Sequence, residues 1–488
     1  MAHEIAVLDL PLLQRLRRIN QVDVVSLVFP SGNHNRFEHT LGVTVIAEKM
    51  VAAIFRKVRE GKINKVDFDE DYVLRHVRMA AILHDCGHGP FSHMSEEIYK
   101  YCDDYLEEKR TNPVLGGASP HEVLSYLIVT CDAFKSFFQT YIAEPYGIEV
   151  DLDFVGEMIV GYNGDVDAAK DPERAKRAFI VDVINGAFDA DKIDYIQRDS
   201  HFTGIKMVLD IDRLFHTIDI IEVDGKQRLS VDMSGVSTLE QIVFNKMMLF
   251  STVYHHHKVR AAECLFKSIF EEIRRNGIAA FDRDFSSAAD FLYLTDDDVY
   301  GLAKKKKLGR VAEFAANLMR RELPKRALAI SQKTIANSGD EGDNLIEDIM
   351  SLRHTPDKLE DLRQAIAEET RAMNQPVPPE EIWIDIPANP QFKEGTEWPV
   401  KDIGTGKGYK RLREIFPVDD WTRAFSENKW HGFVFTRPQY QEVVCRAARK
   451  VFEEVYDIKF NEYAWFLCKI EQYPEVNAPS HFEVCQKP

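Results

Sequence analysis

The sequence predicts a mainly α-helical protein with a helical core domain, a small β-hairpin and a C-terminal α/β lobe. Apolar residues recur at helical spacing through most of the first 300 residues, whereas strand-like runs and long polar loops become frequent after that point. With 488 residues, of which 45% are hydrophobic, the chain can bury large cores. We therefore expect a helical domain over residues 1–300 and a smaller α/β lobe over residues 301–488.

The first helices are marked by capping residues and by apolar faces. Asp9, in "DLPLLQRLRRI", is placed to cap a helix that has a proline in its first turn. Asn35 could cap the next helix, and the segment "EDYVLRHVRMAAILHD" forms another that runs to His84. Gly87, Gly89 and Pro90 then break the helical pattern. The apolar positions after Asn35 follow helical spacing: Val43, Ala47, Met50, Val51 and Ile54.

Further elements follow in order along the chain. Ser119 and Pro120 start a helix, and a long helical segment is expected from about Glu173 to Gly204. The acidic cluster "DADKID" falls in the middle of that segment, where aspartate has poor helix propensity. A metal or a substrate would explain carboxylates in such a place. Asp224-Gly225 between two β-like runs predicts a hairpin, and a helical block from Leu239 to about Asn276 follows it.

Composition excludes several classes of protein. The formal net charge of −17 argues against nucleic acid as the main partner. No apolar run approaches the roughly 18 residues that a membrane-spanning helix needs, so no membrane partner is expected. The N-terminus lacks the pattern of a signal peptide, and the seven cysteines are scattered without a C-x-x-C pair. These features predict reduced thiols and a cytoplasmic protein.

Histidines and carboxylates gather near the caps and breaks of the expected helices. Imidazole and carboxylate groups without thiolate suit Zn, Fe, Mn, Co or Ni, and leave coordination positions for water and a phosphate oxygen. Such an ion would lower the pKa of its bound water, so metal-assisted hydrolysis is the chemistry that this pattern indicates. The alternative is a histidine-rich structural core. The residues concerned are His39, His84, Asp85, His88, His93 and His121.

The order H…HD…D, formed by His39, His84-Asp85 and Asp191, resembles the signature of HD-domain phosphohydrolases. The longer segments "FPSGNHNRFEHTLGV", "HDCGHGPFSH" and "DADKIDYIQRD" are similar to the deoxynucleoside triphosphate (dNTP) triphosphohydrolase branch of that family. The resemblance covers residues 9–265 and continues more weakly into the C-terminal lobe.

The resemblance implies a role for each matching residue. The implied reaction is attack of water at the α-phosphorus, which releases a nucleoside and inorganic triphosphate. His121 would be the general acid, Glu122 would orient the proton transfer, and His88 and His93 would lie on the phosphate side. The implied ligands of the divalent metal, whose identity stays open and could also be Mg, are His39, His84, Asp85 and Asp191. The implied substrate contacts are Arg36 and Lys192 to the triphosphate, and Gln21, Tyr195 and Asp199 near the sugar and base.

The sequence departs from the family pattern in one helix. Aligned through "HHHKV", Met247 takes the position of an arginine for the γ-phosphate, and His255 that of a tyrosine under the deoxyribose. Lys246 and Lys258 lie nearby and could bind phosphate. The alternatives therefore stay open: an HD-type phosphodiesterase or phosphatase on another nucleotide or an oligonucleotide end, or a catalytically silent nucleotide sensor.

The resemblance also bears on regulation and assembly. Asp9, Gln14 and Arg17 keep an arrangement that forms a guanine-nucleotide activator site in the vertebrate branch. The alternative is that this segment is only the first helix of the fold. Members of the family are typically dimers to hexamers, so a homo-oligomer is expected. The C-terminal lobe would serve assembly or pocket closure.

Overall fold

The computed structural model describes residues 1–63, 66–162, 171–278, 281, 283, 285–337, 339–388, 396–402, 404 and 408–469. The described residues form two compact units, one within Met1–Glu322 and Pro390–Thr422 and the other within Leu323–Asn389 and Arg423–Pro488. Helices predominate in both, which confirms the predicted mainly α fold class. The predicted boundary after residue 300 falls inside the first unit, because α17 packs against α15 there.

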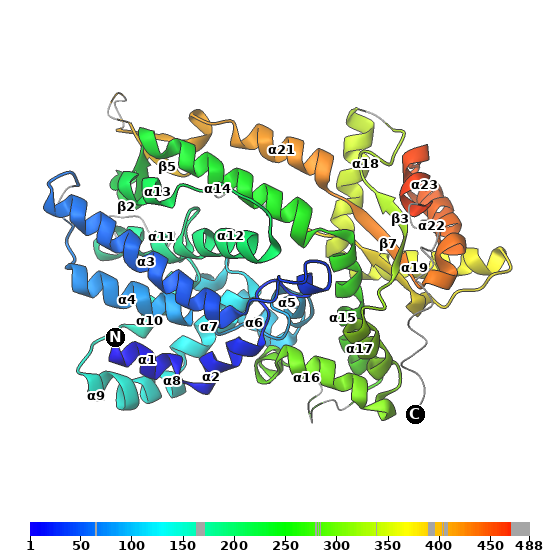
Figure 1. The fold of residues 1–488 in the computed structure, drawn as a ribbon, viewed down its shortest axis with the longest axis horizontal. Coiled ribbons are helices and arrows are strands. Elements are labelled where there is room, and N and C mark those ends of the chain that lie inside the picture. The colour runs from blue at the N-terminus through cyan, green and yellow to red at the C-terminus, as the bar shows by residue number, and fades with distance from the viewer. Residues whose placement is uncertain are drawn as a thin grey trace, which may run out of the picture. The chain divides into compact units, whose positions relative to one another are not determined.

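The first unit is a helical assembly with a four-stranded sheet (Figure 1). Its helices are α1 (Ala2–Leu8), α2 (Pro11–Gln14), α3 (Arg36–Arg59), α4 (Glu70–Leu83), α5 (His93–Tyr99), α6 (Asp103–Thr111), α7 (Pro120–Thr130), α8 (Asp132–Phe138), α9 (Glu144–Tyr146), α10 (Leu152–Ile159), α11 (Pro172–Asn185), α12 (Ala190–Thr203), α13 (Ile211–Thr217), α14 (Val236–Leu249), α15 (His257–Arg275), α16 (Asp296–Gly301) and α17 (Arg310–Arg320).

The helices that frame the site begin where the sequence predicts. The Asn35 side chain accepts the Glu38 N–H and caps α3, and Ser119 caps α7 with Pro120 in its first turn. The predicted apolar face of α3 is buried against α4, and the two helices lie side by side (Figure 1). Helix α4 ends with His84 as its C-cap, just before the predicted break.

One cap prediction and one predicted helix are wrong. Asp9 ends α1, and α2 begins after Leu10, because Pro11 takes the first helical position. The expected single helix from Glu173 to Gly204 is two helices, α11 and α12, separated at Gly186. Asp189 is the N-cap of α12 and Asp191 lies in its first turn. Aspartate is favourable at both positions, so its low propensity inside helices needs no further explanation.

The sheet of the first unit is built around the predicted hairpin. Strands β1 (Ile218–Val223) and β2 (Lys226–Asp232) are antiparallel and turn at Asp224 and Gly225, which both have positive φ. Arg228 of β2 pairs with buried Asp182 of α11, which attaches the hairpin to the helices. Strand β5 (Pro399–Lys401) adds in parallel to β2, and β6 (Tyr409–Arg411) adds antiparallel to β5.

The helical block after the hairpin contains an irregular turn. Helix α14 continues into a π-helical turn, Phe250–Tyr254, before α15 begins. A π-helical turn accommodates one more residue than an α-helical turn does, so side chains after it are rotated relative to a regular helix. This rotation changes which side chain of the "YHHHK" segment meets α12.

The second unit is a small α/β assembly. Its antiparallel sheet has the order β3-β7-β4, and "EIWIDIP" and "HGFVFTRP" supply β4 and β7 as predicted. Apolar residues of its helices, among them Ile366, Val444 and Phe452, form the core with Val434 of β7. The elements are β3 (Lys325–Ile330), α18 (Asp340–Ser351), α19 (Pro356–Ala372), β4 (Ile382–Asp385), the end of α21 (Val418–Lys429), β7 (Gly432–Thr436), α22 (Gln441–Tyr456) and α23 (Glu462–Lys469).

Within the part of the chain that the structure describes, no helix is long and apolar enough to cross a bilayer. The cysteines among those residues are free thiols, and Cys485 lies outside them.

Gly42 permits the close approach of α3 to α12, and its replacement tests that packing. A Cβ at this position would lie 1.9 Å from Asp194 Oδ1 and 2.4 Å from Arg198 Nη2. Gly42→Ala should therefore destabilise the protein by about 1–3 kcal/mol, measured by chemical denaturation. Gly301→Ala is the control, because a Cβ there meets nothing within 4 Å. An unchanged stability of Gly42→Ala would contradict the packing described here.

Candidate active site

Three helices converge on a group of imidazoles and carboxylates. His39 comes from the first turns of α3, His84 caps the end of α4, and Asp191 lies in the first turn of α12. His39 Nε2 lies 2.9 Å from Asp191 Oδ1, and His84 Nε2 lies 3.3 Å from Asp85 Oδ1. The structure thus brings together the four residues that the resemblance implies as metal ligands.

His39 is held from both sides of its ring. Its Nδ1 hydrogen-bonds Asp194 Oδ2 at 2.7 Å, while Nε2 faces Asp191. Burial disfavours the charged imidazole, but the adjacent carboxylates of Asp191 and Asp194 raise the pKa of His39 to about 10. A carboxylate behind a histidine in this way orients the ring and increases its basicity, as in many metal sites.

The donor set fits a divalent metal. Nε2 of His39 and Nε2 of His84 are buried and lack a hydrogen-bond partner in the described residues. With an Asp191 oxygen they lie within 4.8 Å of one another, and Asp85 Oδ2 is 3.8 Å from His39 Nε2. Imidazole and carboxylate ligands suit several divalent ions. The chemistry of the donors leaves the identity of the metal open.

Arg36 connects this group to the loop that follows α4. Its Nη1 donates to Asp85 Oδ2 at 2.9 Å, its Nε donates to Ser92 Oγ at 2.8 Å, and its side chain is 3% exposed. Burial opposes ionisation of Asp85, but the Arg36 guanidinium holds the pKa of Asp85 well below its usual range. Nη2 of Arg36 also lies 3.3 Å from His93 Nε2. Arg36 therefore orients Asp85 in addition to any contact with substrate.

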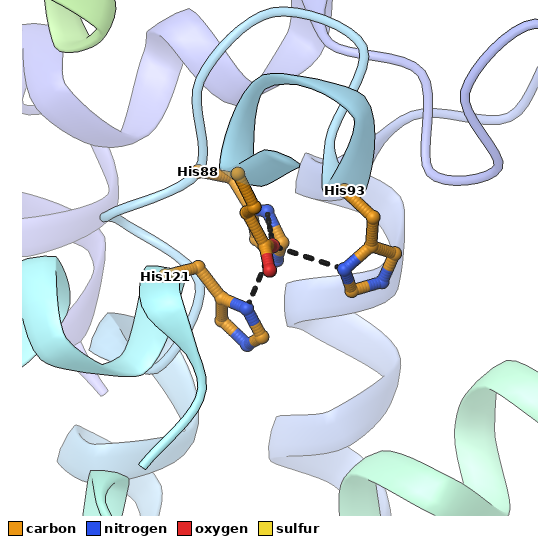
Figure 2. Close-up of side chains that lie close together, drawn as sticks. His88, His93 and His121 are labelled. Atoms are coloured by element: carbon orange, nitrogen blue, oxygen red, sulfur yellow. Dashed lines mark hydrogen bonds and ion pairs between the residues drawn. The ribbon is translucent and has the colours of Figure 1, made fainter. Parts of the chain in front are cut away.

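A second group of histidines surrounds one buried carboxylate. Figure 2 shows His88, His93 and His121 directed toward one another. Glu96 Oε1 lies 2.9 Å from Nδ1 of His93, 2.9 Å from Nδ1 of His121 and 3.2 Å from Nδ1 of His88. The rings of His88 and His121 stack with centroids 3.9 Å apart. Glu96 was not expected from the sequence to take part in this site.

Glu96 sets the protonation of its neighbours. Burial opposes its ionisation, but the charges of His93 and His121 hold the pKa of Glu96 well below its usual range. Burial likewise disfavours charged His121, but the Glu96 carboxylate raises the pKa of His121 above its ordinary value. His121 can therefore carry a proton near neutral pH, as a general acid must.

The expected partner of His121, Glu122, is engaged elsewhere. One carboxylate oxygen accepts the Ser119 N–H as the second half of a capping box, and the other accepts from Asn185 Nδ2 at 2.8 Å. A residue at the third position of a helix turns back toward the cap, which directs Glu122 away from the His121 ring. Glu96, not Glu122, contacts His121.

One face of α12 carries the residues expected at the sugar and phosphates. Lys192, Tyr195 and Asp199 follow helical spacing. Lys192 Nζ donates to Asp189 Oδ2 at 2.7 Å and to Gly186 O at 3.0 Å. Asp199 Oδ1 lies 2.7 Å from His34 Nε2.

The second oxygen of Asp199 accepts from the hydroxyl of Tyr254. The alignment through "HHHKV" had placed His255 at this point. The π-helical turn Phe250–Tyr254 absorbs one residue, so that Tyr254 is the side chain that reaches α12, while the His255 ring packs against Phe250. Lys258 lies in the first turn of α15.

The expected activator residues lie at the end of α1, in α2 and in the short 3-10 turn that follows α2. Gln14 Oε1 accepts from Arg17 Nε at 2.8 Å, and the Arg17 guanidinium lies 3.8 Å from the centroid of the Phe37 ring. Asp9 is exposed at the end of α1. These contacts agree with an ordinary first helix and do not test whether a nucleotide binds there.

Several residues of the site were missed from sequence. Glu96 lies three residues after His93, a helical pair that could have indicated it. Asp194 belongs to the acidic cluster already noted, and its contact with His39 becomes visible only once α3 and α12 are packed. Nothing in the sequence signals that His34 and Tyr254 meet at Asp199.

Comparison with known proteins agrees with this geometry. The family profile described as the HD domain matches residues 36–184. The profile described as the HD associated region matches residues 209–459, which is more than half of the 488 residues. The matched segments include the histidines of both groups together with Asp85 and Glu96, whereas Asp191 and Asp194 lie between the two profiles.

The relatives that match extend over much of the chain. Uncharacterized protein MJ1154 from Methanocaldococcus jannaschii is 24% identical, over 88% of this chain and 75% of its own length. The deoxynucleoside triphosphate triphosphohydrolase SAMHD1 of Homo sapiens is 30% identical, over 52% of this chain and 39% of its own length. The SAMHD1 homolog of Dictyostelium discoideum is 29% identical, over 54% and 43%. The match thus spans less than half of either triphosphohydrolase. The chain belongs to the HD-domain phosphohydrolases, in the branch that carries an HD-associated region and includes the deoxynucleoside triphosphate triphosphohydrolases.

Proposed function

We propose that this protein hydrolyses (deoxy)nucleoside triphosphates to a nucleoside and inorganic triphosphate. The observation that supports this best is the junction of two groups at one carboxylate. We call His39, His84, Asp85 and Asp191 the metal-type group. Asp85 Oδ1 lies 3.3 Å from His84 Nε2 in this group and 3.3 Å from His88 Nε2 in the group around Glu96. A cation site and a proton donor therefore lie side by side, as phosphoryl hydrolysis requires.

His39, His84, Asp85 and Asp191 would hold the divalent metal, which would lower the pKa of bound water and neutralise charge on a phosphoryl oxygen. In the reaction, the oxygen of a water molecule forms a bond to the α-phosphorus, the bond from phosphorus to the 5′ oxygen breaks, and one proton of the attacking water is released to solvent, from which His121 is reprotonated after the step. The His121 imidazolium donates its proton to that 5′ oxygen, so that the nucleoside leaves as a neutral alcohol. Glu96 fixes the orientation of His121 and stabilises its charge.

The remaining residues would bind the two ends of the substrate. Arg36 and Lys192 offer cations to the phosphates, and His93, whose side chain is 58% exposed, is accessible from solvent on the same side. Asp199 and Tyr195 of α12 would contact the sugar, and Tyr254 orients the Asp199 carboxylate. Gln21 would lie near the sugar and the base.

The alternatives drawn from the sequence receive less support. The case for a different phosphorylated substrate rests on Met247 and His255 at the positions of an arginine and a tyrosine, and Tyr254 supplies a hydroxyl at Asp199. A silent sensor would be expected to have lost part of the metal group or His121, and all of these residues are present. Assembly into a homo-oligomer, and activation by a nucleotide at Asp9, Gln14 and Arg17, are further proposals that rest on the family alone.

A substrate panel tests the proposed reaction. Purified protein supplied with Mn²⁺ or Mg²⁺ should convert members of a panel of eight NTPs and dNTPs, given singly and mixed, to nucleoside and intact triphosphate resolved by chromatography. Activity that appears only in mixtures would indicate a nucleotide activator. Formation of phosphate or pyrophosphate instead of triphosphate would contradict the reaction.

The assignment of the metal ligands predicts a larger loss of metal in a ligand variant than in a variant of the residue that supports a ligand. Asp191→Ala removes a proposed ligand and should abolish stoichiometric metal, measured by elemental analysis of the purified protein. Asp194→Asn leaves the four ligands intact but weakens the support of His39, so metal affinity should fall by about 10- to 100-fold in a chelator competition. Full metal content in Asp191→Ala would show that Asp191 is not a ligand.

Two carboxylate variants separate the roles of Glu96 and Glu122. Glu96→Gln removes the charge that holds the proton on His121, and kcat should fall by about 100-fold or more while metal content is kept. Glu122→Gln preserves the capping box, because glutamine also serves at that position, and should keep kcat near the wild-type value. Loss of kcat in Glu122→Gln with normal turnover in Glu96→Gln would restore the partner expected from sequence.

A further inference from the structure

Asp23 is a charged residue near the reaction centre that the proposed chemistry does not use. Its φ is +52°, a left-handed conformation that residues with a side chain seldom adopt. Val22 and Val24 beside it are 5% and 0% exposed, so the backbone is anchored on both sides. Strained backbone of this kind is often found at functional sites, where surrounding structure maintains it.

The loop that carries Asp23 is fixed at both ends. The Gln21 N–H donates to His34 O at 2.9 Å, and the Arg36 N–H donates to Ile19 O at 3.0 Å. Nη2 of Arg36 also donates to the carbonyl oxygen of Gln21 at 3.3 Å. The loop is therefore held directly against the start of α3, where Arg36 lies.

Two acceptor atoms on this loop are buried without a hydrogen-bond donor from the described residues. They are Oδ1 of Asp23 and Oε1 of Gln21. Buried acceptors are nearly always satisfied, because leaving one unpaired costs free energy. Two such atoms on alternate residues of one loop match a ligand that brings hydrogen-bond donors.

The electrostatic surroundings place Asp23 near both ends of the proposed substrate. Burial raises the pKa of Asp23 to about 6, although the charges of His93 and Arg36 oppose this rise. The charge of Asp23 in turn acts on Tyr254, which contacts Asp199 at the sugar side. Asp23 is thus within electrostatic range of the reacting histidines and of the residues expected at the sugar.

The chemistry of a carboxylate decides which part of a nucleotide it can bind. A carboxylate would repel the phosphates that Arg36 and Lys192 are proposed to bind. It accepts hydrogen bonds from sugar hydroxyls and from the N–H groups of bases, and so does the amide oxygen of Gln21. Sugar hydroxyls and base N–H groups therefore present the same chemistry to this loop, a neutral hydrogen-bond donor on the nucleoside.

We propose that Asp23, with Gln21 beside it, accepts hydrogen bonds from the nucleoside part of the substrate and so determines which nucleotides are hydrolysed. This inference rests on the proposed function, since it takes the substrate to be a nucleotide. Asp23 acts as a specificity residue and does not touch the bond that breaks.

Asp23→Gly tests the proposal without strain, because glycine adopts positive φ freely. The variant should be at least as stable as the wild type, while KM for the best nucleotide of the panel rises about 10- to 100-fold and kcat stays within about twofold. Asp224→Gly is the matched control. Asp224 has the same φ of +52° but lies exposed in the hairpin turn, so its KM should not change.

Substrate analogues identify the donor. A 2′,3′-dideoxy nucleotide lacks the sugar hydroxyls, and an inosine nucleotide lacks the amine of its guanosine counterpart. The analogue that lacks the bound donor should show a raised KM with wild-type protein and no further rise with Asp23→Gly. If the dideoxy nucleotide shows this behaviour, Asp23 contacts the sugar. If the inosine nucleotide shows it, Asp23 contacts the base.

Two results would overturn the proposal: an unchanged KM in Asp23→Gly with analogue preferences intact, or a lower KM, which would mean that the carboxylate only repels the phosphates. A wild-type protein that hydrolyses no member of the panel would contradict the proposed function instead. In that case calorimetric binding of the same nucleotides to wild type and Asp23→Gly still tests Asp23.

Discussion

The fixation of His39 between two carboxylates of one helix is the constraint on which the rest of the site depends. Asp194 binds Nδ1 and Asp191 faces Nε2, so the His39 ring fixes the position of α3 relative to α12. This contact is possible because Gly42 leaves room for Asp194. Once α3 is placed, Arg36 in its first turn is placed as well, and with it Asp85. The positions of the metal-type group and of the group around Glu96 therefore both depend on the packing of α3 against α12.

The sequence predicts what local chemistry determines. The caps at Asn35 and Ser119 and the turn at Asp224 depend on side chains within a few residues, and each was predictable. The four proposed metal ligands, His39, His84, Asp85 and Asp191, follow from the resemblance to HD-domain enzymes, and their roles stay proposals. Asp189 was misread as a mid-helix residue because the break at Gly186 was not recognised. Partners on separate helices, such as Glu96 for His121, become visible only through packing.

Irregular backbone recurs where the site is built. Phe91 and Ser92 both have positive φ, and the Phe91 N–H is held by Asp296 Oδ1 at 2.6 Å while Ser92 accepts from Arg36. Asp23 is strained in the same sense, and the π-helical turn delivers Tyr254 to Asp199. Regular helices position the metal-type ligands, whereas these irregular segments orient the side chains that are proposed to surround the substrate. Such segments are retained where function compensates their conformational cost.

The parallel pairing of β5 with β2 has a consequence for how the chain is made. Val400 lies opposite Val231, and Lys401 also pairs with Asp219 of β1 at 2.8 Å, although these partners are far apart in the sequence. The ribosome must therefore synthesise the Leu323–Asn389 part of the second unit before the first unit can close its sheet. Until then the edge of β2 is open to pairing with other chains. A chain truncated near residue 322 would lack β5 and β6 and would keep that edge open permanently.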